Sequence, residues 1–337
     1  MATHRAVHVK SAGQPLTLVD VETVSPPPGH VRLAVRACGV CGTDHGVVAG
    51  AFPGMTWPVT PGHEIAGAIA EIGEGVEGFA VGDRVAVGWF GGNCNRCEPC
   101  RRGFFMQCVN GQVPSLSYPG GYAESVTAPA AALARIPDAL SFAEAAPMGC
   151  AGVTTFNALR RTRAVAGDLV AVLGVGGLGH LGVQWANAMG FETVAIARGA
   201  GKAADARELG AHHYVDSTAR DVAAELQKLG GATVVLATAA NSAAMAQTVG
   251  GLGPEGQLVI VGVTPDPLPI SPLDLISSGL SVSGHPSGTS RDVEETMAFA
   301  VQTGVRARVE EKPLAEAAAA YAAMEEGRAR YRMVLTN

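Results

Sequence analysis

The chain has 337 residues, more than a single small hydrophobic core usually organises, so two domains are expected. Hydrophobic residues make up 47% of it and the net charge at pH 7 is −6, with no block of Lys or Arg that would favour a nucleic acid or an anionic membrane as partner. We expect no secretory signal and no membrane span, because no apolar run approaches about 18 residues, and therefore a cytoplasmic protein.

The N-terminal part of the chain is predicted to be rich in β-structure. Three segments alternate or run apolar between turns that contain Gly and Pro, and they are 31–37, 65–72 and 83–87. This part also carries all seven cysteines. In a reducing compartment such a set indicates metal binding or catalysis more than disulfide bonds.

One group of candidate ligands is dispersed along this part. Cys41 lies in CGVCGTD, His63 lies in PGHE and Cys150 ends APMGC. Two thiolates and one imidazole form an open zinc site, which leaves a fourth position for water or substrate. The spacing alone does not decide, because a Cys38/Cys41 redox pair and a purely structural His63 remain alternatives.

A second group of cysteines is compact. Cys94, Cys97 and Cys100 are separated by two residues each, and Cys108 follows after seven more. Four thiolates in one loop predict a closed, structural zinc site. An iron–sulfur cluster would need the last cysteine three residues on with a proline after it, and a disulfide is disfavoured by the compartment.

From residue 152 the pattern changes to strands that alternate with helices. The strand-like segments are 169–173, 193–197, 213–215, 233–236, 257–261 and 280–283. This alternation predicts a doubly wound parallel sheet. After residue 289 a helix at 293–301, an alanine-rich helix around 317–320 and a final strand at 333–335 are expected to return to the first domain.

A glycine turn lies between the strand at 169–173 and a helix expected at 178–189. Its glycines are spaced G-x-G-x-x-G, which predicts a turn that places a dinucleotide pyrophosphate at the N-terminus of the helix. The alternative is a tight turn without a ligand. The candidate cofactor-binding residues here are Gly174, Gly176, Gly177, Leu178 and Gly179.

Taken in this order, the motifs ACGVCGTD, PGHE, the C-x2-C-x2-C-x7-C loop, AAPMGCAGVTTFNAL and VLGVGGLGHLGVQWA resemble the zinc-dependent medium-chain alcohol dehydrogenases. The likeness covers essentially the whole chain and is nearest to the bacterial and yeast-type branch, with cinnamyl-alcohol-type reductases nearby. It implies an α/β fold with a β-rich, GroES-like catalytic domain and a doubly wound Rossmann domain. The implied boundaries are 1–151 for the catalytic domain with a structural zinc loop at 91–111, 152–288 for the nucleotide-binding domain, and 289–337 for the return.

The resemblance also implies two zinc ions per chain. The catalytic ion would be held by Cys41, His63 and Cys150, with Glu64 able to approach it, and Asp44 would fix the His63 ring. The structural ion would be held by Cys94, Cys97, Cys100 and Cys108.

Further roles are carried over from the same resemblance. Thr43 would accept the substrate proton, Thr154 would pack against the nicotinamide, and Arg332 would reach the cofactor phosphates. Phe52 and Trp89 would line the substrate pocket, although a core position for Trp89 is an equal alternative. Most relatives carry a histidine where this chain has Gly46, and the sequence leaves open whether His45 replaces that proton relay.

The implied activity is reversible hydride transfer between a primary or secondary alcohol and a nicotinamide cofactor, with zinc polarising the oxygen. Ala197 ends the second strand where NAD-preferring relatives have an acidic residue, and Arg198 and Lys202 could pair with a 2′-phosphate. NADP is therefore preferred, with NAD as the alternative.

Two other classes of function remain open from the sequence. One is a zinc-free quinone or enoyl reductase on the same fold, and the other is a noncatalytic nucleotide-binding protein. The expected partner is a small alcohol or aldehyde, and the resemblance implies a homotetramer or homodimer joined partly through the nucleotide-binding domains.

Overall fold

The computed structural model describes residues 2–337 and divides into two compact units. The first unit runs up to Val153 and resumes at Ser287–Asn337, and the second is Thr154–Pro286.

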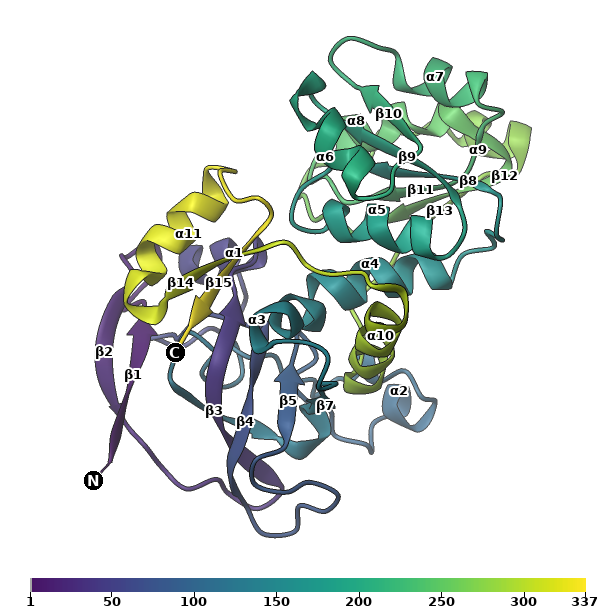
Figure 1. Cartoon of the computed structure of the whole chain (residues 1–337). Coiled ribbons are helices and arrows are strands. Elements are labelled where there is room, and N and C mark those ends of the chain that lie inside the picture. Colours follow the sequence, from purple (N-terminus) through teal and green to yellow (C-terminus); the bar gives the residue numbers. More distant parts are fainter. Residues whose placement is uncertain (1) are drawn as a thin grey trace. The chain divides into compact units, whose positions relative to one another are not determined.

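The first unit is built on a seven-stranded sheet in the order β14-β15-β3-β4-β5-β7, with β6 beside β3 and a separate β1-β2 hairpin. The strands are β1 (Thr3–His8), β2 (Thr17–Glu22), β3 (His30–Gly39), β4 (Ile65–Ile72), β5 (Arg84–Val87), β6 (Ser125–Pro129), β7 (Ala134–Arg135), β14 (Val309–Pro313) and β15 (Arg332–Thr336). β15 pairs antiparallel with β3, which brings the C-terminal segment into this unit (Figure 1).

The long strand β3 illustrates why this sheet forms. Val31, Leu33 and Val35 alternate with partly exposed residues and are buried, as expected for a strand with one face on the core. The helices of the unit are α1 (Thr43–Ala49), α2 (Glu98–Arg101), α3 (Phe142–Ala145), α10 (Ser290–Thr303) and α11 (Ala317–Glu325), and α4 (Ala151–Arg160) crosses the boundary to the second unit.

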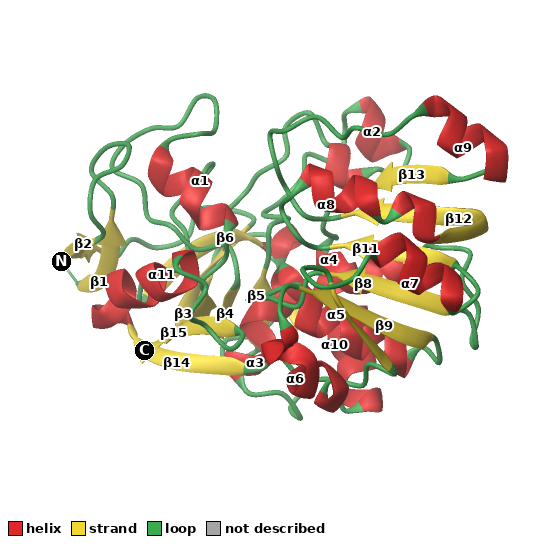
Figure 2. Cartoon of the chain, turned by 90° about the horizontal axis from the view of Figure 1, so that it is seen from above, coloured by secondary structure: helices red, strands yellow, loops and turns green. Residues whose placement is uncertain are grey.

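The second unit is a six-stranded, fully parallel sheet in the order β10-β9-β8-β11-β12-β13. This is the strand order of the doubly wound dinucleotide-binding fold, with its reversal between β8 and β11. Figure 2 shows β9, β8, β11, β12 and β13 side by side with helices along the sheet. All five residues of β8 are buried, because both faces of a parallel sheet are covered.

The strands of the second unit are β8 (Leu169–Leu173), β9 (Glu192–Ala197), β10 (His213–Asp216), β11 (Ala232–Ala237), β12 (Leu252–Ile260) and β13 (Ser281–Gly284). Its helices are α5 (Gly179–Ala188), α6 (Ala203–Glu208), α7 (Val222–Lys228), α8 (Ser242–Gln247) and α9 (Pro272–Ser278). The structure confirms the predicted fold class and the six predicted strands of this unit. Within residues 2–337, no helix has the length and apolar character that crossing a membrane requires.

Four segments of the first unit converge at one end of its sheet. β3 and β5 end there, while β4 and β15 begin there, as the pairs Cys38–Ile65, Ile65–Val87 and Val334–Gly39 show. The residues that follow or precede these strand ends therefore lie close together, and they include most of the candidate catalytic residues.

Candidate active site

The dispersed ligands predicted from the sequence come together at this end of the sheet. One ligand atom from each of Cys41, His63, Glu64 and Cys150 lies within 4.8 Å of the others. Cys41 follows β3, His63 and Glu64 precede β4, and Cys150 lies between a 3-10 turn at Ala146–Gly149 and α4. Cys38 is buried but is not part of this cluster, so the structure gives no support to a Cys38/Cys41 pair.

Two glycines allow these segments to approach so closely. A Cβ atom on Gly39 would lie 1.9 Å from Oε2 of Glu64, and one on Gly88 would lie 2.0 Å from the carbonyl oxygen of Gly149. Both distances are far shorter than the contacts that Cβ atoms make with other heavy atoms in proteins. The strand that leads to Cys41 and the turn that leads to Cys150 therefore depend on residues without side chains at these points.

Asp44 organises the buried side of the cluster. One carboxylate oxygen lies 3.1 Å from Nδ1 of His63, and the other accepts the backbone N–H of Cys41 at 2.9 Å and the hydroxyl of Tyr122 at 3.0 Å. All of these side chains are buried. Because Nδ1 of His63 faces the carboxylate, the ring presents Nε2 to the cluster. This arrangement agrees with the prediction that Asp44 fixes the His63 ring.

Glu64 and Arg332 form a buried ion pair beside the cysteines. Nη2 of Arg332 contacts both carboxylate oxygens of Glu64 at 2.5 Å. Burial raises the pKa of Glu64 to about 7, while the neighbouring guanidinium acts in the opposite direction. The family resemblance implies that Arg332 reaches the cofactor phosphates. The structure instead pairs its guanidinium with Glu64, and a phosphate contact stays a prediction.

The donor set fits a zinc ion. Among the described residues, 2–337, the buried Nε2 of His63 has no hydrogen-bond partner. A hydrogen bond from Cys150 is the largest of the effects that hold the pKa of Cys41 well below its usual value, which favours the thiolate form that binds metals. An unpartnered imidazole nitrogen, two thiols and a carboxylate in one cluster are ligands that zinc accepts.

An aromatic wall borders this cluster. The Trp89 ring packs edge-on against His63 at 5.2 Å between ring centroids, and the Phe52 ring lies 6.0 Å from Trp89. A Cβ atom on Gly46 would lie 3.0 Å from the Phe52 ring. The space that a side chain at position 46 would enter is therefore occupied by Phe52.

Thr43 and His45, the neighbours of Asp44 in the sequence, lie in different surroundings. Thr43 is the first residue of α1 and is partly exposed. The side chain of His45 is 66% exposed, and its Nδ1 contacts Glu325 of α11, with the Tyr321 hydroxyl at 3.4 Å. His45 thus binds the neighbouring helix, as a solvent-facing residue can, and this arrangement does not favour a role as the proton relay.

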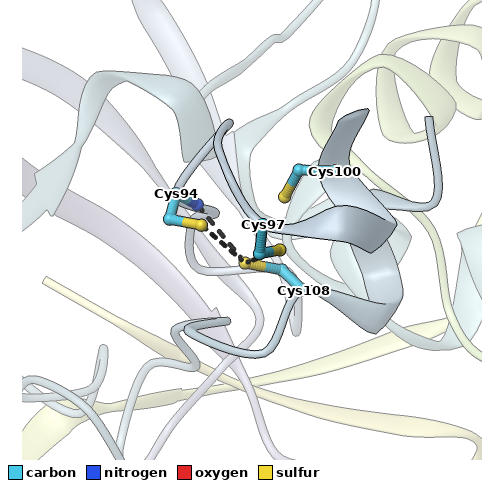
Figure 3. A group of neighbouring side chains, drawn as sticks. All are labelled: Cys94, Cys97, Cys100 and Cys108. Atoms are coloured by element: carbon cyan, nitrogen blue, oxygen red, sulfur yellow. Dashed lines mark hydrogen bonds between the residues drawn. The ribbon is translucent and has the colours of Figure 1, made fainter. Parts of the chain in front are cut away.

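The compact cysteines form a second cluster, on the loop that includes α2. Sγ of Cys108 lies 3.6 Å from Sγ of Cys94 and 3.8 Å from Sγ of Cys97, and Figure 3 shows Cys100 completing the group. Sulfur atoms on a tetrahedral zinc ion are about 3.8 Å apart for a Zn–S bond of about 2.3 Å. The hydrogen bond from Asn110 is the main effect that lowers the pKa of Cys94 to about 5. The geometry fits the predicted zinc site with four cysteine ligands.

In the second unit, the glycine turn has the shape that the sequence predicts. Gly174 has φ +97°, and a Cβ atom on Gly179 would lie 1.8 Å from the carbonyl oxygen of Gly174. A Cβ atom on Gly176 would enter open space, which leaves room for a ligand at the backbone. No side chain within residues 2–337 caps α5 at Leu178, so the first N–H groups of the helix are suited to phosphate oxygens.

The other candidate cofactor residues lie around this turn and α4. Arg198 is exposed directly after β9, and Nζ of Lys202 donates to the carbonyl oxygen of Val175, next to the glycine turn, at 2.7 Å. Thr154 is buried in α4. The roles of all three toward a cofactor stay predictions.

Sequence reasoning missed Tyr122 and the partnership between Glu64 and Arg332. Tyr122 is 78 residues from Asp44, and Arg332 is 268 residues from Glu64. Neither belongs to a local motif with its partner. Only the order of strands in the sheet brings them together.

Comparisons with known proteins cover both units. A model described as "Alcohol dehydrogenase GroES-like domain" matches residues 27–138, and one described as "Zinc-binding dehydrogenase" matches residues 177–302. "Alcohol dehydrogenase patD" of Penicillium expansum is 41% identical over 99% of this chain and 98% of its own length. "Aldehyde reductase AdhA" of Synechocystis sp. is 33% identical over 91% of each chain. The solved structure of the cinnamyl alcohol dehydrogenase SbCAD4 from Sorghum bicolor has a TM-score of 0.90 at 28% identity, covering 99% of this chain and 98% of that one.

Proposed function

Because this chain belongs to the zinc-type medium-chain alcohol dehydrogenase family, and is an oxidoreductase of the alcohol dehydrogenase and aldehyde reductase type, we propose its specific reaction. The reaction is reversible hydride transfer between a primary or secondary alcohol and NADP(H). It requires zinc at Cys41, His63 and Cys150, and a second, structural zinc ion at the four cysteines of the α2 loop.

The observation that carries this proposal is the cluster of two thiols, one imidazole and one carboxylate within 4.8 Å. Zinc in such a site acts as a Lewis acid, which lowers the pKa of an alcohol and polarises a carbonyl group. A zinc-free reductase on the same fold would not require a buried, unpartnered Nε2 of His63 beside two cysteines.

The residues of this chain then hold the reactants and the proton. Asp44 fixes the His63 ring through Nδ1, and its bond to the N–H of Cys41 holds the loop that carries that ligand. The Thr43 hydroxyl, two residues after Cys41, would accept the alcohol proton while it donates its own proton to water, and the reverse transfer would protonate the product alcohol during reduction. Trp89 and Phe52 exclude water and offer apolar surface to the carbon skeleton of the substrate.

The glycine turn and the loop after β9 bind the cofactor, whose nicotinamide accepts or donates the hydride. The open space at Gly176 would allow its backbone to approach the pyrophosphate, and the uncapped N-terminus of α5 would supply N–H donors to it. Arg198 pairs with the 2′-phosphate of NADP(H), since Ala197 brings no carboxylate to repel it.

A pair of cysteine variants tests the two-zinc arrangement. Cys41→Ser is expected to reduce alcohol turnover by at least about 1,000-fold, while the protein stays folded and retains about one zinc ion per chain. Cys97→Ser is expected to lower the melting temperature, because structural zinc contributes folding energy. Turnover, metal content by mass spectrometry and melting temperature are the three readouts. Near-normal turnover in Cys41→Ser would show that the catalytic site has been assigned wrongly.

A further inference from the structure

The loop that follows β9 is bordered by the end of β10. The two strands are parallel, and Ala197, the last residue of β9, pairs in register with Asp216, the last residue of β10. In doubly wound folds the adenosine ribose lies at the carboxyl end of this second strand. Asp216 is therefore an acidic side chain at the same end of the sheet, although it comes from the neighbouring strand.

Side chains of β10 fix the backbone of this loop at Gly199. Its N–H donates to Oδ1 of Asp216 at 2.8 Å, and its carbonyl oxygen accepts the hydroxyl of Tyr214 at 2.5 Å. Gly199 has φ 74° and ψ 159°, a conformation open essentially to glycine alone. The backbone of the loop that carries Arg198 is thus fixed at Gly199, and one of the groups that fix it is the Asp216 carboxylate.

Asp216 is ionised at neutral pH. Oδ1 also accepts the N–H of Thr218 at 2.9 Å and its hydroxyl at 2.7 Å. The hydrogen bonds from Thr218 lower the pKa of this carboxyl below its usual value. A full negative charge therefore lies beside Gly199, the residue that follows the exposed Arg198 in the sequence.

We propose that Asp216 is a determinant of cofactor specificity, whose charge weakens binding of a 2′-phosphate and so limits the preference for NADP(H) that Arg198 provides. The inference rests on the proposed binding of a nicotinamide dinucleotide at the glycine turn. The proposal assigns the acidic residue of this site to the end of β10, because the end of β9 carries Ala197 and no acidic residue.

The charge can be removed without removing the hydrogen bonds. In Asp216→Asn, the amide oxygen can still accept from Gly199 and Thr218, so only the charge changes. Asp216→Glu retains the charge. A matched control is Asp168→Asn, because Asp168 also accepts a backbone N–H, from Val165 at 2.9 Å, but precedes β8 at the opposite end of the parallel strands.

The experiment measures dissociation constants of adenosine 2′,5′-bisphosphate and adenosine 5′-monophosphate by calorimetry, which requires neither turnover nor zinc chemistry. Asp216→Asn is expected to tighten the bisphosphate about fivefold relative to the monophosphate, as one partly screened charge interaction near a surface would. Asp216→Glu and Asp168→Asn are expected to keep the wild-type ratio. The melting temperature of each variant is measured alongside, and Asp216→Ser replaces Asp216→Asn if the latter does not fold.

An unchanged ratio in the neutral variants overturns the proposal, and so does equal weakening of both nucleotides, which would mean that Asp216 only holds the loop. If the wild-type chain prefers the monophosphate, the NADP preference is wrong, yet the shift expected for Asp216→Asn still tests the role of its charge. If the wild-type chain binds neither nucleotide, the proposed cofactor site is wrong and the Asp216 proposal with it.

Discussion

Asp44 has more partners than any other acidic side chain of the candidate active site, and the pattern of these partners explains its burial. Its two oxygens accept the Cys41 N–H and the Tyr122 hydroxyl and face Nδ1 of His63. A buried carboxylate is tolerated only when such donors surround it. Loss of one donor therefore costs more here than at a neutral acceptor.

Tyr122→Phe tests this directly. We expect it to lower the free energy of unfolding by about 1–3 kcal/mol, because Asp44 loses a charge-assisted hydrogen bond in a buried site. The comparison variant is Tyr118→Phe, which removes a hydroxyl that donates to the neutral carbonyl of Gly91 at 3.0 Å. Urea unfolding of the zinc-loaded proteins gives both values. Equal losses in the two variants would argue against a special role of the carboxylate.

The proposed preference for NADP depends on Arg198. Arg198→Asp should raise the KM for NADPH about 10- to 100-fold, the size of a lost charge-assisted pair, and leave the KM for NADH unchanged or lower. Arg207→Asp, on the neighbouring helix α6, makes the same charge change away from β9 and should alter neither constant. Unaltered use of NADPH by Arg198→Asp would mean that another group reads the 2′-phosphate.

At the scale of elements, the close approach of β3 and β4 at the site depends on Gly39. Gly39→Ala should lower the free energy of unfolding by about 3 kcal/mol or more, because its Cβ atom would overlap the Glu64 carboxylate and disturb the buried pair with Arg332. Gly201→Ala is a suitable control, since its Cβ atom would meet nothing within 4 Å. Denaturant titration of both variants measures this loss of stability. Similar midpoints in the two variants would contradict the claim that β3 and β4 approach closely because position 39 is glycine.

Element boundaries also show where sequence reasoning fell short. The bounds of β4 and β8 agree with the predicted segments 65–72 and 169–173, because clear apolar patterns end at turn residues. β12 begins at Leu252, five residues before the predicted start at 257. The residues LGPEG at its start are typical of a turn, and only Leu252 among them pairs with β11, opposite Ala232, before a register shift to the pair of Val234 and Gln257. A propensity pattern cannot indicate such an irregular pairing, since the neighbouring strand imposes it.

At the scale of the whole molecule, local motifs and the family resemblance predicted the two clusters of candidate metal ligands that the structure brings together, because each of these residues lies in a short motif. The partners of those ligands were not predictable in the same way. Tyr122, Arg332 and the bond from Gly199 to Asp216 join segments that only the strand order brings together. The oligomeric state, which the resemblance implies to be a homotetramer or homodimer, stays a prediction.

The most direct test of the central claim is the initial rate at which the zinc-loaded protein reduces benzaldehyde, with NADPH and NADH compared at equal limiting concentrations. We expect reduction with both zinc ions bound and a clear preference for NADPH, because the proposal assigns activation of the carbonyl oxygen to zinc at the cluster of Cys41 and binding of the 2′-phosphate to Arg198. A preference for NADH would contradict the assignment of Arg198, and no reduction of aldehydes or oxidation of alcohols with either cofactor would contradict the proposed reaction as a whole.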